Sequence, residues 1–431
     1  MDRRLQIRYE ALVRAHLRSV NTLAAGPAVP AGESSAQTAT QAAWRFLNNE
    51  RIALPALAEP LRQAGRTATG RSSSPFVLVV HDWCKLDFKT HTSKTDVLQL
   101  THENDVGYDL TTSLLVDAAS GEPLAPVQMH LKTAKAVHST AVEAPGLDDH
   151  HLEQLLPTMN EVVSWGLPRR PVHIIDREAD SLGHFRQWTA ANHLFLVRAD
   201  DRRVLWNGIP RLLSEIVEEL ARQRRFTGTR EVSYHGQTAV QQIAETTVVL
   251  HKPHKTRRGG KQYEVVGPPI ELRLVVARIT TAEGELLAEW MLFTNLPVNE
   301  ASAAEIALWY YWRWRIESFF KLLKGHGLQV EQWQQETGAA IARRLLVAAM
   351  ACVVAWTLQH DSAPAAEEFK RVLVKLSGRR MKYGVKSTTP ALLAGYFVYL
   401  SMIDFLNHSS YNLDQLQSLA RETGFSFHDT T

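Results

Sequence analysis

Cysteine is nearly missing from this chain. Only two cysteines, Cys84 and Cys352, occur among 431 residues, and they stand far apart in largely apolar surroundings. This excludes a disulfide-stapled scaffold and a zinc site built from cysteines, and it suits a reducing compartment. We therefore expect the protein to work in the cytoplasm.

Long apolar runs are also missing. Residues Met1–Arg4 lead into no signal-peptide core. The longest nearly unbroken apolar run, Leu345–Leu358, is too short to cross a bilayer and predicts a buried helix instead. We expect no membrane association, and no internal repeat or low-complexity tract indicates a fibrous or disordered protein.

A strong charge of either sign is lacking as well. The formal net charge is +3, so the total charge by itself indicates no nucleic-acid partner. Hydrophobic residues make up 45% of the chain and charged residues 22%, which are ordinary proportions for a globular protein. A chain of this length exceeds one ordinary core, so we expect two or three domains.

The first 70 residues or so have a helical pattern. Leu5–Val20 carries apolar residues at helical spacing. Ala24–Ser35 is a soft segment rich in alanine, glycine, proline and serine. Ala42–Asn49 is a second helical piece, and a linker at Arg66–Pro75 then indicates a domain boundary.

Strands and helices alternate after this linker. Phe76–Val80 is a continuous β-branched and apolar run, which is typical of a buried strand. A hairpin turning at Gly121–Pro123 follows, and the order of elements predicts a mixed α/β sheet. The other expected strands are Tyr108–Val116, Pro126–Lys132, Val172–Ile175 and Leu194–Val197, and the expected helices are His151–Trp165 and Ser181–Ala190.

Strands alone fill Thr227–Asn295, and a long helix follows them. A basic loop, Lys252–Lys261, interrupts these strands; it suits phosphate groups and equally fits a solvated hairpin tip. The helix begins at Ser302, which has capping-box spacing with Glu305, and ends at Gly325. The clearest strands of the segment are Thr246–Leu250, Glu271–Ile279 and Glu289–Phe293.

Two aspartates follow strands of the α/β region. Asp82 comes just past Phe76–Val80, and Asp176 comes just past Val172–Ile175. Ligands of α/β sheets tend to bind at strand ends, so the two acids can share a site. The alternative is that each is an exposed carboxylate in a loop, where most aspartates lie.

The long helix places one acid among several cations. One face holds five residues within an arc of roughly 80°, and these are Tyr310, Arg313, Glu317, Lys321 and Lys324. The opposite side carries apolar residues that can pack on a core, namely Leu308, Trp312, Phe319 and Leu322. A solvated face with ordinary ion pairs is one interpretation. A metal ligand flanked by phosphate contacts is the other.

The spacing on this helix resembles a known signature. Tyr310-x2-Arg313-x3-Glu317-x6-Lys324 is similar to the Tyr-Arg-Glu-Lys signature of the transposases of bacterial insertion sequences, a branch of the DDE transposases. The run Asp176–Asp180, which reads Asp-Arg-Glu-Ala-Asp, resembles the second-aspartate motif of that family.

Other segments extend the resemblance from about residue 40 to about residue 360. Asp82 after its strand is similar to the first aspartate of the family. Trp290–Val298 resembles the strand before the glutamate helix, and Ala42–Asn49 resembles part of the N-terminal DNA-binding region.

The resemblance implies a fold and a domain order. It implies an α/β protein with an RNase-H-like mixed-sheet core, an all-β insertion, and helical N-terminal and C-terminal regions. The implied parts are a helical DNA-binding domain at 1–70, a core at 76–226 and 296–360, the insertion at 227–295, and a C-terminal helical region at 361–431 that is a candidate dimer interface.

The resemblance also implies an activity. Asp82, Asp176 and Glu317 would hold two Mg²⁺ ions, for which Mn²⁺ can substitute, because Mg²⁺ prefers carboxylate oxygens and two such ions assist phosphodiester cleavage. The enzyme would bind the terminal inverted repeats of its element as a homodimer on double-stranded DNA. It would excise the element through a hairpin intermediate and insert it into target DNA by strand transfer.

Several DNA contacts belong to this expectation. Tyr310, Arg313 and Lys324, joined by Lys321, would hold phosphates near the scissile bond. Trp290 and Trp314 would stack an extruded base, although a tryptophan within a strand equally suits a core. Further expected contacts with the DNA backbone are Arg45, Arg198, Arg202 and Arg203.

Two other functions stay open at this point. One is a regulator that binds DNA without cutting it, because relatives commonly carry additional residues ahead of the region resembling Ala42–Asn49. The other is a nuclease of RNase-H-like fold that cuts DNA without joining it.

One polar run lies apart from these motifs. Asp148–His151 reads Asp-Asp-His-His, a composition that suits a metal site. Adjacent side chains rarely converge on one ion without a helix or strand spacing. We therefore expect the aspartates to cap the helix that follows.

Overall fold

The computed structural model describes most of the chain, and the chain forms two compact units. The described residues are 3–18, 35–234, 237–258, 261–325, 328–408 and 410–422. The unit that we call the sheet unit comprises Ala58–Lys85 and Asp109–Phe320, and the helical unit comprises Met1–Leu57, Leu86–Tyr108 and Lys321–Thr431. Nearly all of the expected soft segment Ala24–Ser35 lies outside the described residues, as do the side chains 255–262 of the basic loop.

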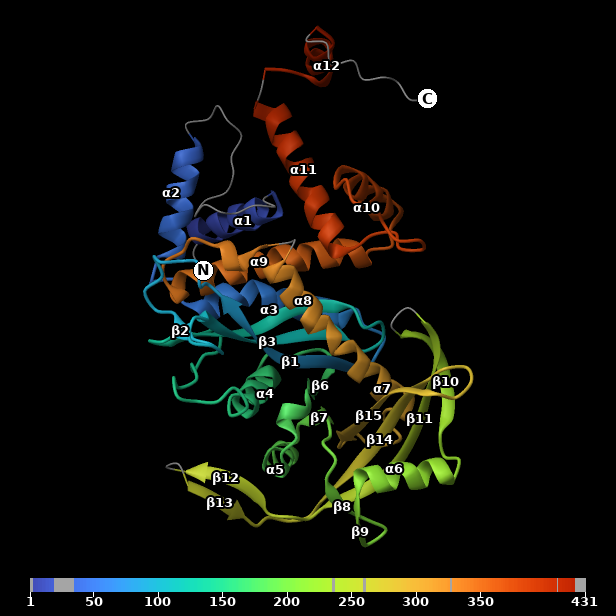
Figure 1. The fold of residues 1–431 in the computed structure, drawn as a ribbon. Coiled ribbons are helices and arrows are strands. Elements are labelled where there is room, and N and C mark those ends of the chain that lie inside the picture. The colour runs from blue at the N-terminus through green and yellow to red at the C-terminus, as the bar shows by residue number, and fades with distance from the viewer. Residues whose placement is uncertain are drawn as a thin grey trace. The chain divides into compact units, whose positions relative to one another are not determined.

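A mixed sheet dominates the sheet unit (Figure 1). In the described part of the chain it has thirteen strands in the order β5-β4-β3-β1-β6-β7-β15-β14-β11-β8-β9, with β10 beside β11 and β2 beside β3. The strands are β1 Phe76–Asp87, β2 Leu98–Gln99, β3 Val106–Asp117, β4 Pro123–Lys132, β5 Val137–Ser139, β6 Arg170–Ile175, β7 Leu194–Arg198, β8 Arg203–Trp206, β9 Ile209–Leu212, β10 Thr227–Tyr234, β11 Gln237–Leu250, β14 Ile270–Thr280 and β15 Leu286–Thr294. The predicted mixed α/β architecture is confirmed.

β1 is a central buried strand, as the sequence predicts. Its residues Phe76–Val80 are at most 3% exposed and pair in parallel with Arg170–Ile174 of β6, and β6 pairs in parallel with β7. Parallel strands need crossover connections. The helices α4 (Leu155–Ser164) and α5 (Leu182–Ala190) lie in these crossovers and contact β6 and β7 (Figure 1).

The strand β1 is longer than the sequence indicates. It continues to Asp87, so Asp82 lies within a strand and not past its end. The pairing of β1 with β6 stops at Val80, but β3 remains as a hydrogen-bonded neighbour. Because a strand needs only one partner, β1 continues past β6.

Two expected helices also have different limits. Helix α4 begins at Leu155 and not at His151, because the preceding residues form turns in which Glu153 accepts a hydrogen bond from the His150 N–H. The helix expected from Ser302 to Gly325 divides into α7 (Ala303–Trp312) and α8 (Trp314–Lys324). At the division the Arg313 N–H bonds to the carbonyl of Tyr310, three residues back, so the chain tightens locally there.

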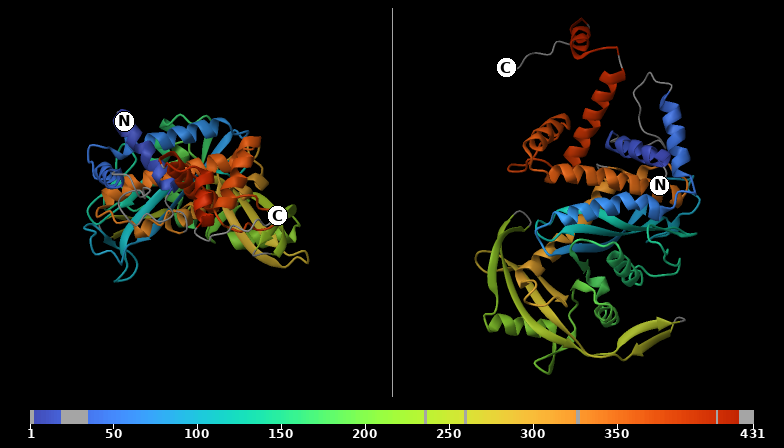
Figure 2. Two further views of the ribbon diagram at one scale, coloured as in Figure 1. Left: turned by 90° about the horizontal axis from the view of Figure 1, so that it is seen from above. Right: turned by 180° about the vertical axis from the view of Figure 1, so that it is seen from behind.

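Residues 227–295 are rich in strands, as the sequence predicts. β11 and β14 pair antiparallel over Val240–Leu250, and β15 joins them to β7 where Leu292 faces Arg198. These strands therefore continue the central sheet. A second ribbon, β12 (His254–Arg258) with β13 (Lys261–Val265), is separate from it (Figure 2). Helix α6 (Leu213–Arg222) precedes β10.

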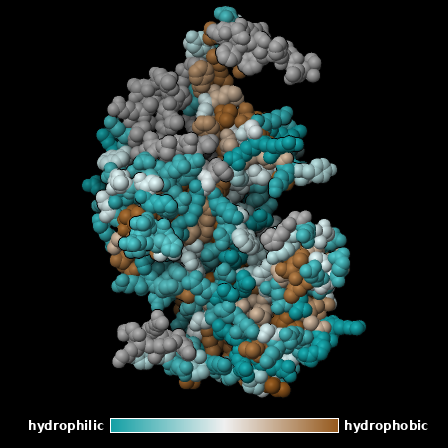
Figure 3. Space-filling view, in the orientation of Figure 1, coloured by the Kyte–Doolittle hydropathy of each residue, from teal (hydrophilic) through white to brown (hydrophobic). Residues whose placement is uncertain are grey.

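The helical unit is built around α9 (Gly338–His360), which contains the predicted buried run. The Arg343 guanidinium of α9 donates to the carbonyls of Leu47 and Ile52. By length and composition α9 and α11 could each cross a membrane, but 83% of the apolar window of α9 is buried, against 22% for α11. Figure 3 shows hydrophobic side chains on the surface along α11. The other helices of this unit are α1 Arg3–Arg18, α2 Ser35–Leu47, α10 Pro364–Leu376, α11 Thr389–His408 and α12 Leu413–Glu422, whereas α3 Leu54–Gly70 belongs mostly to the sheet unit.

Candidate active site

Asp82 of β1 is the most buried of the three predicted acids, with 9% of its surface exposed. Its Oδ1 accepts a hydrogen bond from the Trp83 N–H at 2.9 Å, and its Oδ2 accepts one from Nη1 of Arg313 at 2.7 Å. This arginine comes from the α7–α8 junction, more than 200 residues along the chain. The pair therefore fixes the junction against β1.

Asp176 directly follows β6, as the sequence predicts. Its side chain accepts the Arg177 N–H at 2.7 Å and so caps the short 3₁₀ helix η1 (Arg177–Ala179). The Tyr310 hydroxyl donates to Asp176 Oδ1 at 3.0 Å, and Arg313 Nη2 lies 3.7 Å from Asp176 Oδ2. Two residues of the predicted helix face thus contact the second aspartate.

Glu317 completes the group from α8. Its Oε1 lies 3.8 Å from Nη2 of Arg313, one helical turn earlier. All three predicted acids therefore have a carboxylate oxygen within 4 Å of one guanidinium, and all belong to the sheet unit. The structure brings together residues that the sequence places in two strands and one helix.

The helix end that carries Glu317 is anchored by the β3–β4 turn. The indole Nε1 of Trp309 donates to the Ala118 carbonyl at 3.0 Å, and Arg315 Nε donates to the Gly121 carbonyl at 2.7 Å. Gly121 has a φ of 73°, and a Cβ there would meet the Trp312 ring at 2.3 Å. At the other end, Ser302 and Glu305 form the predicted capping box. These contacts set the position of Arg313 and Glu317.

The electrostatics of the two aspartates differ. Burial raises the pKa of Asp82 to about 6, although the charge of Arg313 and the Trp83 N–H oppose this. Burial also acts to raise the pKa of Asp176, but Arg313, the Arg177 N–H and the Tyr310 hydroxyl outweigh it and the pKa falls below its ordinary value. Burial raises the pKa of Tyr310, so its hydroxyl stays a proton donor. The site thus holds acids of unequal strength around one cation.

The donor set fits a hard divalent cation. The three carboxylates offer only oxygen ligands, which Mg²⁺ prefers. Arg313 supplies positive charge where these carboxylates converge, because its guanidinium lies within 4 Å of an oxygen of each. The residues able to hold a metal at this site are therefore Asp82, Asp176 and Glu317.

An aromatic cavity of about 110 Å³ lies beside Tyr310. Trp290 of β15 and Trp314 of α8 both line it. Trp290 is half-buried and Trp314 is 57% exposed, so neither is an ordinary core residue. Sequence reasoning did not find the other polar and aromatic lining, which is Arg230, Tyr234, Gln241 and Tyr311. Most of these come from β10 and β11, and no motif connects those strands with α7.

The remaining predicted contacts have different surroundings. Arg198, at the end of β7, helps to lower the pKa of Asp176. Arg202 is engaged within the protein, because its Nη2 lies 2.8 Å from the buried carboxylate of Asp180. Arg203 is exposed. In the helical unit Arg45 is exposed beside an exposed Trp44, Lys321 is exposed, and Lys324 lies 3.7 Å from Glu331.

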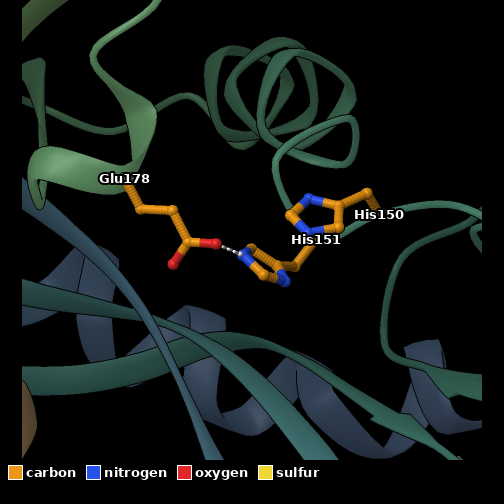
Figure 4. A group of neighbouring side chains, drawn as sticks. All are labelled: His150, His151 and Glu178. Atoms are coloured by element: carbon orange, nitrogen blue, oxygen red, sulfur yellow. Dashed lines mark hydrogen bonds and ion pairs between the residues drawn. The ribbon is translucent and has the colours of Figure 1, made fainter. Parts of the chain in front are cut away.

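The Asp148–His151 run does not cap a helix, so that prediction is wrong. Asp149 accepts the Gly146 N–H in a local turn, and α4 has Gln154 before its first residue and no acid in its first turn. His151 Nε2 instead lies 2.9 Å from Glu178 Oε1, with His150 beside it (Figure 4). Sequence reasoning did not include Glu178 because it lies 27 residues further along the chain.

A sheet that gathers three carboxylates from two strands and one helix fits the enzymes that process phosphodiesters with metal ions. The family described as "Transposase DDE domain" matches residues 114–354, more than half of the chain, and the chain belongs to that family. The matched residues include Asp176 and Glu317 and begin after Asp82. Transposition of DNA is thus the process in which this protein acts.

The solved structures include a similar one with low identity. It is a piggyBac transposase synaptic complex with hairpin DNA, determined by cryo-electron microscopy. The identity is 7%, the match covers 97% of this chain and 76% of the other, and the TM-score is 0.37. No curated protein matches this chain.

Proposed function

We propose that this protein is a cut-and-paste transposase of a bacterial insertion sequence, from the branch with the Tyr-Arg-Glu-Lys signature. The observation that carries the proposal is the contact of Arg313 with Asp82, Asp176 and Glu317, all within 4 Å. Arg313 and Glu317 belong to the signature, and the two aspartates come from separate strands. An RNase-H-like core, with its acids on two strands and a helix, accounts for this arrangement.

The three carboxylates would bind the metal ions. Two Mg²⁺ ions, when bound, supply an activated water and stabilise the leaving oxygen in phosphodiester cleavage. Asp176 is held for this role by the Arg177 N–H and the Tyr310 hydroxyl. Arg313 now balances the carboxylate charges. When metal ions balance the carboxylate charges instead, Arg313 is the cation best placed to contact the scissile phosphate.

The aromatic cavity would receive a base extruded from the element's end. Removing a base from the stack costs a few kcal/mol, and stacking on aromatic rings offsets about 1–3 kcal/mol of this. Trp314 presents an exposed ring, and Arg230 lies over the Tyr311 ring at 5.6 Å. Cleavage followed by attack of the freed 3′ hydroxyl on the opposite strand would give the hairpin that precedes strand transfer.

Exposed basic and aromatic residues would bind the rest of the DNA. Arg203 in the sheet unit and Arg45 with Trp44 in the helical unit have exposed side chains that suit phosphate and base contacts. Two ends must be held together to be moved, so a homodimer on DNA is part of the proposal. The exposed apolar side chains of α11 are the candidate interface.

Cleavage of a labelled duplex that carries the terminal inverted repeat tests this proposal. The wild type should cut at the element's end with Mg²⁺ and not with EDTA. Glu317→Gln should abolish cutting, whereas Glu283→Gln, which removes an exposed carboxylate near a turn, should leave it unchanged. A second product in which the cut end is joined to target DNA distinguishes a transposase from a simple nuclease.

Cutting that persists in Glu317→Gln would refute the carboxylate site. Tight, sequence-specific binding without cutting, by wild type and variant alike, would favour the DNA-binding regulator instead.

A further inference from the structure

A second group of potential metal ligands lies outside the three carboxylates. His150, His151 and Glu178 each offer one ligand atom, and these atoms all lie within 4.8 Å of one another. His150 and His151 come from the turns before α4, and Glu178 comes from η1 (Figure 4). The chain therefore brings an adjacent histidine pair to a carboxylate from another element.

Each ligand is available without disruption of the core. His150 and Glu178 are exposed, and His151 is half-buried, with 16% of its side chain accessible. His151 Nε2 is hydrogen-bonded to Glu178 Oε1 at 2.9 Å. Nδ1 of His150 accepts the Leu152 N–H at 3.4 Å, so Nε2 is the nitrogen left for an ion.

The distances suit a tetrahedral ion after small side-chain rotations. Bonds of about 2.0–2.1 Å around such an ion separate its ligand atoms by about 3.4 Å. The 2.9 Å contact between His151 and Glu178 would open slightly, and the longer separations to His150, up to 4.8 Å, would close. The exposed ring of His150 can make the larger part of this movement.

We propose that His150, His151 and Glu178 form a binding site for a divalent first-row transition ion such as Zn²⁺, separate from the three-carboxylate site. Two imidazole nitrogens and one carboxylate are ligands that Zn²⁺, Co²⁺ and Ni²⁺ accept, whereas Mg²⁺ requires oxygen ligands. Three protein ligands leave a fourth position for water or for a group from a bound partner.

The place of this site gives it a role next to the aspartates. The His151 ring lies against the Trp83 ring at a tilt of 33°, with ring centres 3.8 Å apart, and Trp83 follows Asp82 in β1. Glu178 lies two residues after Asp176. A bound ion would therefore tie the turns before α4 to η1 and hold the segments that carry both aspartates.

Cobalt binding tests the site without DNA or cleavage. The full chain with Asp82→Asn, Asp176→Asn and Glu317→Gln lacks the oxygen-only ligands, so it isolates the proposed site. We expect this protein to bind one Co²⁺ per chain in equilibrium dialysis, with the visible absorption of imidazole-ligated cobalt. Adding His150→Asn or Glu178→Gln should weaken binding at least about tenfold. Adding His102→Asn, at an exposed histidine elsewhere, should not.

Absence of stoichiometric Co²⁺ binding, or binding unchanged by both ligand substitutions, would overturn the proposal. A second measurement distinguishes loss of metal binding from misfolding of the variants. Zn²⁺ should raise the Tm of the triple variant but not that of the same protein with His150→Asn. Equal rises in both proteins would also overturn it. Because neither assay involves DNA, failure here is distinct from failure of the transposase proposal.

Discussion

Two adjacent residues of β1 show two ways of burying an ionisable side chain. Successive side chains of a strand point to opposite faces of the sheet. Asp82 meets Arg313 on one face, so its charge is balanced by an opposite charge. His81 meets the Ser113 hydroxyl and, at 2.8 Å, the His173 ring, so its hydrogen bonds are satisfied without any charge.

The pKa values express the same difference. Burial lowers the pKa of His81 to about 3 and that of His130 on β4 to about 4, and neighbouring imidazoles add to the effect on His81. These rings are neutral at pH 7. Arg313 instead raises the fraction of ionised carboxylate at Asp176. Asp82 and Asp176 thus gather negative charge around Arg313, whereas His81 and His130 are buried as neutral rings, and only the carboxylates suit a hard metal ion.

Loss of one of the three carboxylates should have the largest effect on the cleavage rate. Asp176→Asn removes a proposed metal ligand while keeping the shape that accepts the Tyr310 hydroxyl. We expect Mg²⁺-dependent cleavage to fall at least about a thousandfold, because the lost ligand supports transition-state charge. Single-turnover cleavage rates measure this. Asp148→Asn, at an exposed acid, is the matched control, and an equal loss there would mean that the assay reports general damage.

Loss of the cation should affect stability as well as activity. Arg313→Ala leaves Asp82 and Asp176 without their positive partner, and breaking a buried pair costs about 3–5 kcal/mol. Urea unfolding in EDTA measures this free energy. Saturating Mg²⁺ should restore part of the stability, because the ion supplies the same charge. Equal destabilisation with and without Mg²⁺ would contradict binding at these carboxylates.

The buried neutral histidine His130 should make the free energy of unfolding depend on pH. The pKa of His130 is about 4 in the folded protein and about 6.5 when unfolded, so the unfolded state binds the proton first. Stability from this residue is therefore present above pH 6.5 and lost as the pH falls to 4, by about 3 kcal/mol.

His130→Asn, which can keep the hydrogen bond to Ser139, tests this account. The loss of unfolding free energy between pH 7 and pH 4 should be smaller in the variant by about that amount, as measured by urea unfolding at each pH. The same substitution at the exposed His102 should leave the loss unchanged. An unaltered pH dependence in His130→Asn would show that His130 can bind a proton while folded.

Loss of a single exposed arginine outside the three-carboxylate site should have the smallest effect, and that effect should be on DNA binding. Arg203→Ala should weaken binding to the terminal repeat and lower the slope of log K against log salt by about 1, because one phosphate contact is lost. Fluorescence anisotropy at several salt concentrations measures this slope. Arg222→Ala, an exposed arginine of α6 paired with Glu219, should keep the wild-type slope.

The spacing of apolar and capping residues along the sequence made much of the fold predictable. The buried strand at Phe76–Val80, the strand before Asp176 and the capping box at Ser302 follow from periodicity and from local hydrogen bonding. The limits of elements were less predictable. β1 extends to Asp87 because a neighbouring strand is present, and α7 ends at Trp312, whose ring lies against Gly121 of the β3–β4 turn. Both reasons lie outside the segment concerned.

The sequence by itself determined which side chains share the glutamate helix, because helical geometry follows from spacing of 3 and 4 residues. It also determined the order of the three acids along the chain. Only the tertiary structure decided that Arg313 contacts all three carboxylates, and that Glu178 rather than a helix end meets His151. The contacts of Arg313 with Asp82 and Asp176, and of His151 with Glu178, join residues from 27 to more than 200 positions apart, and no local periodicity encodes such pairings.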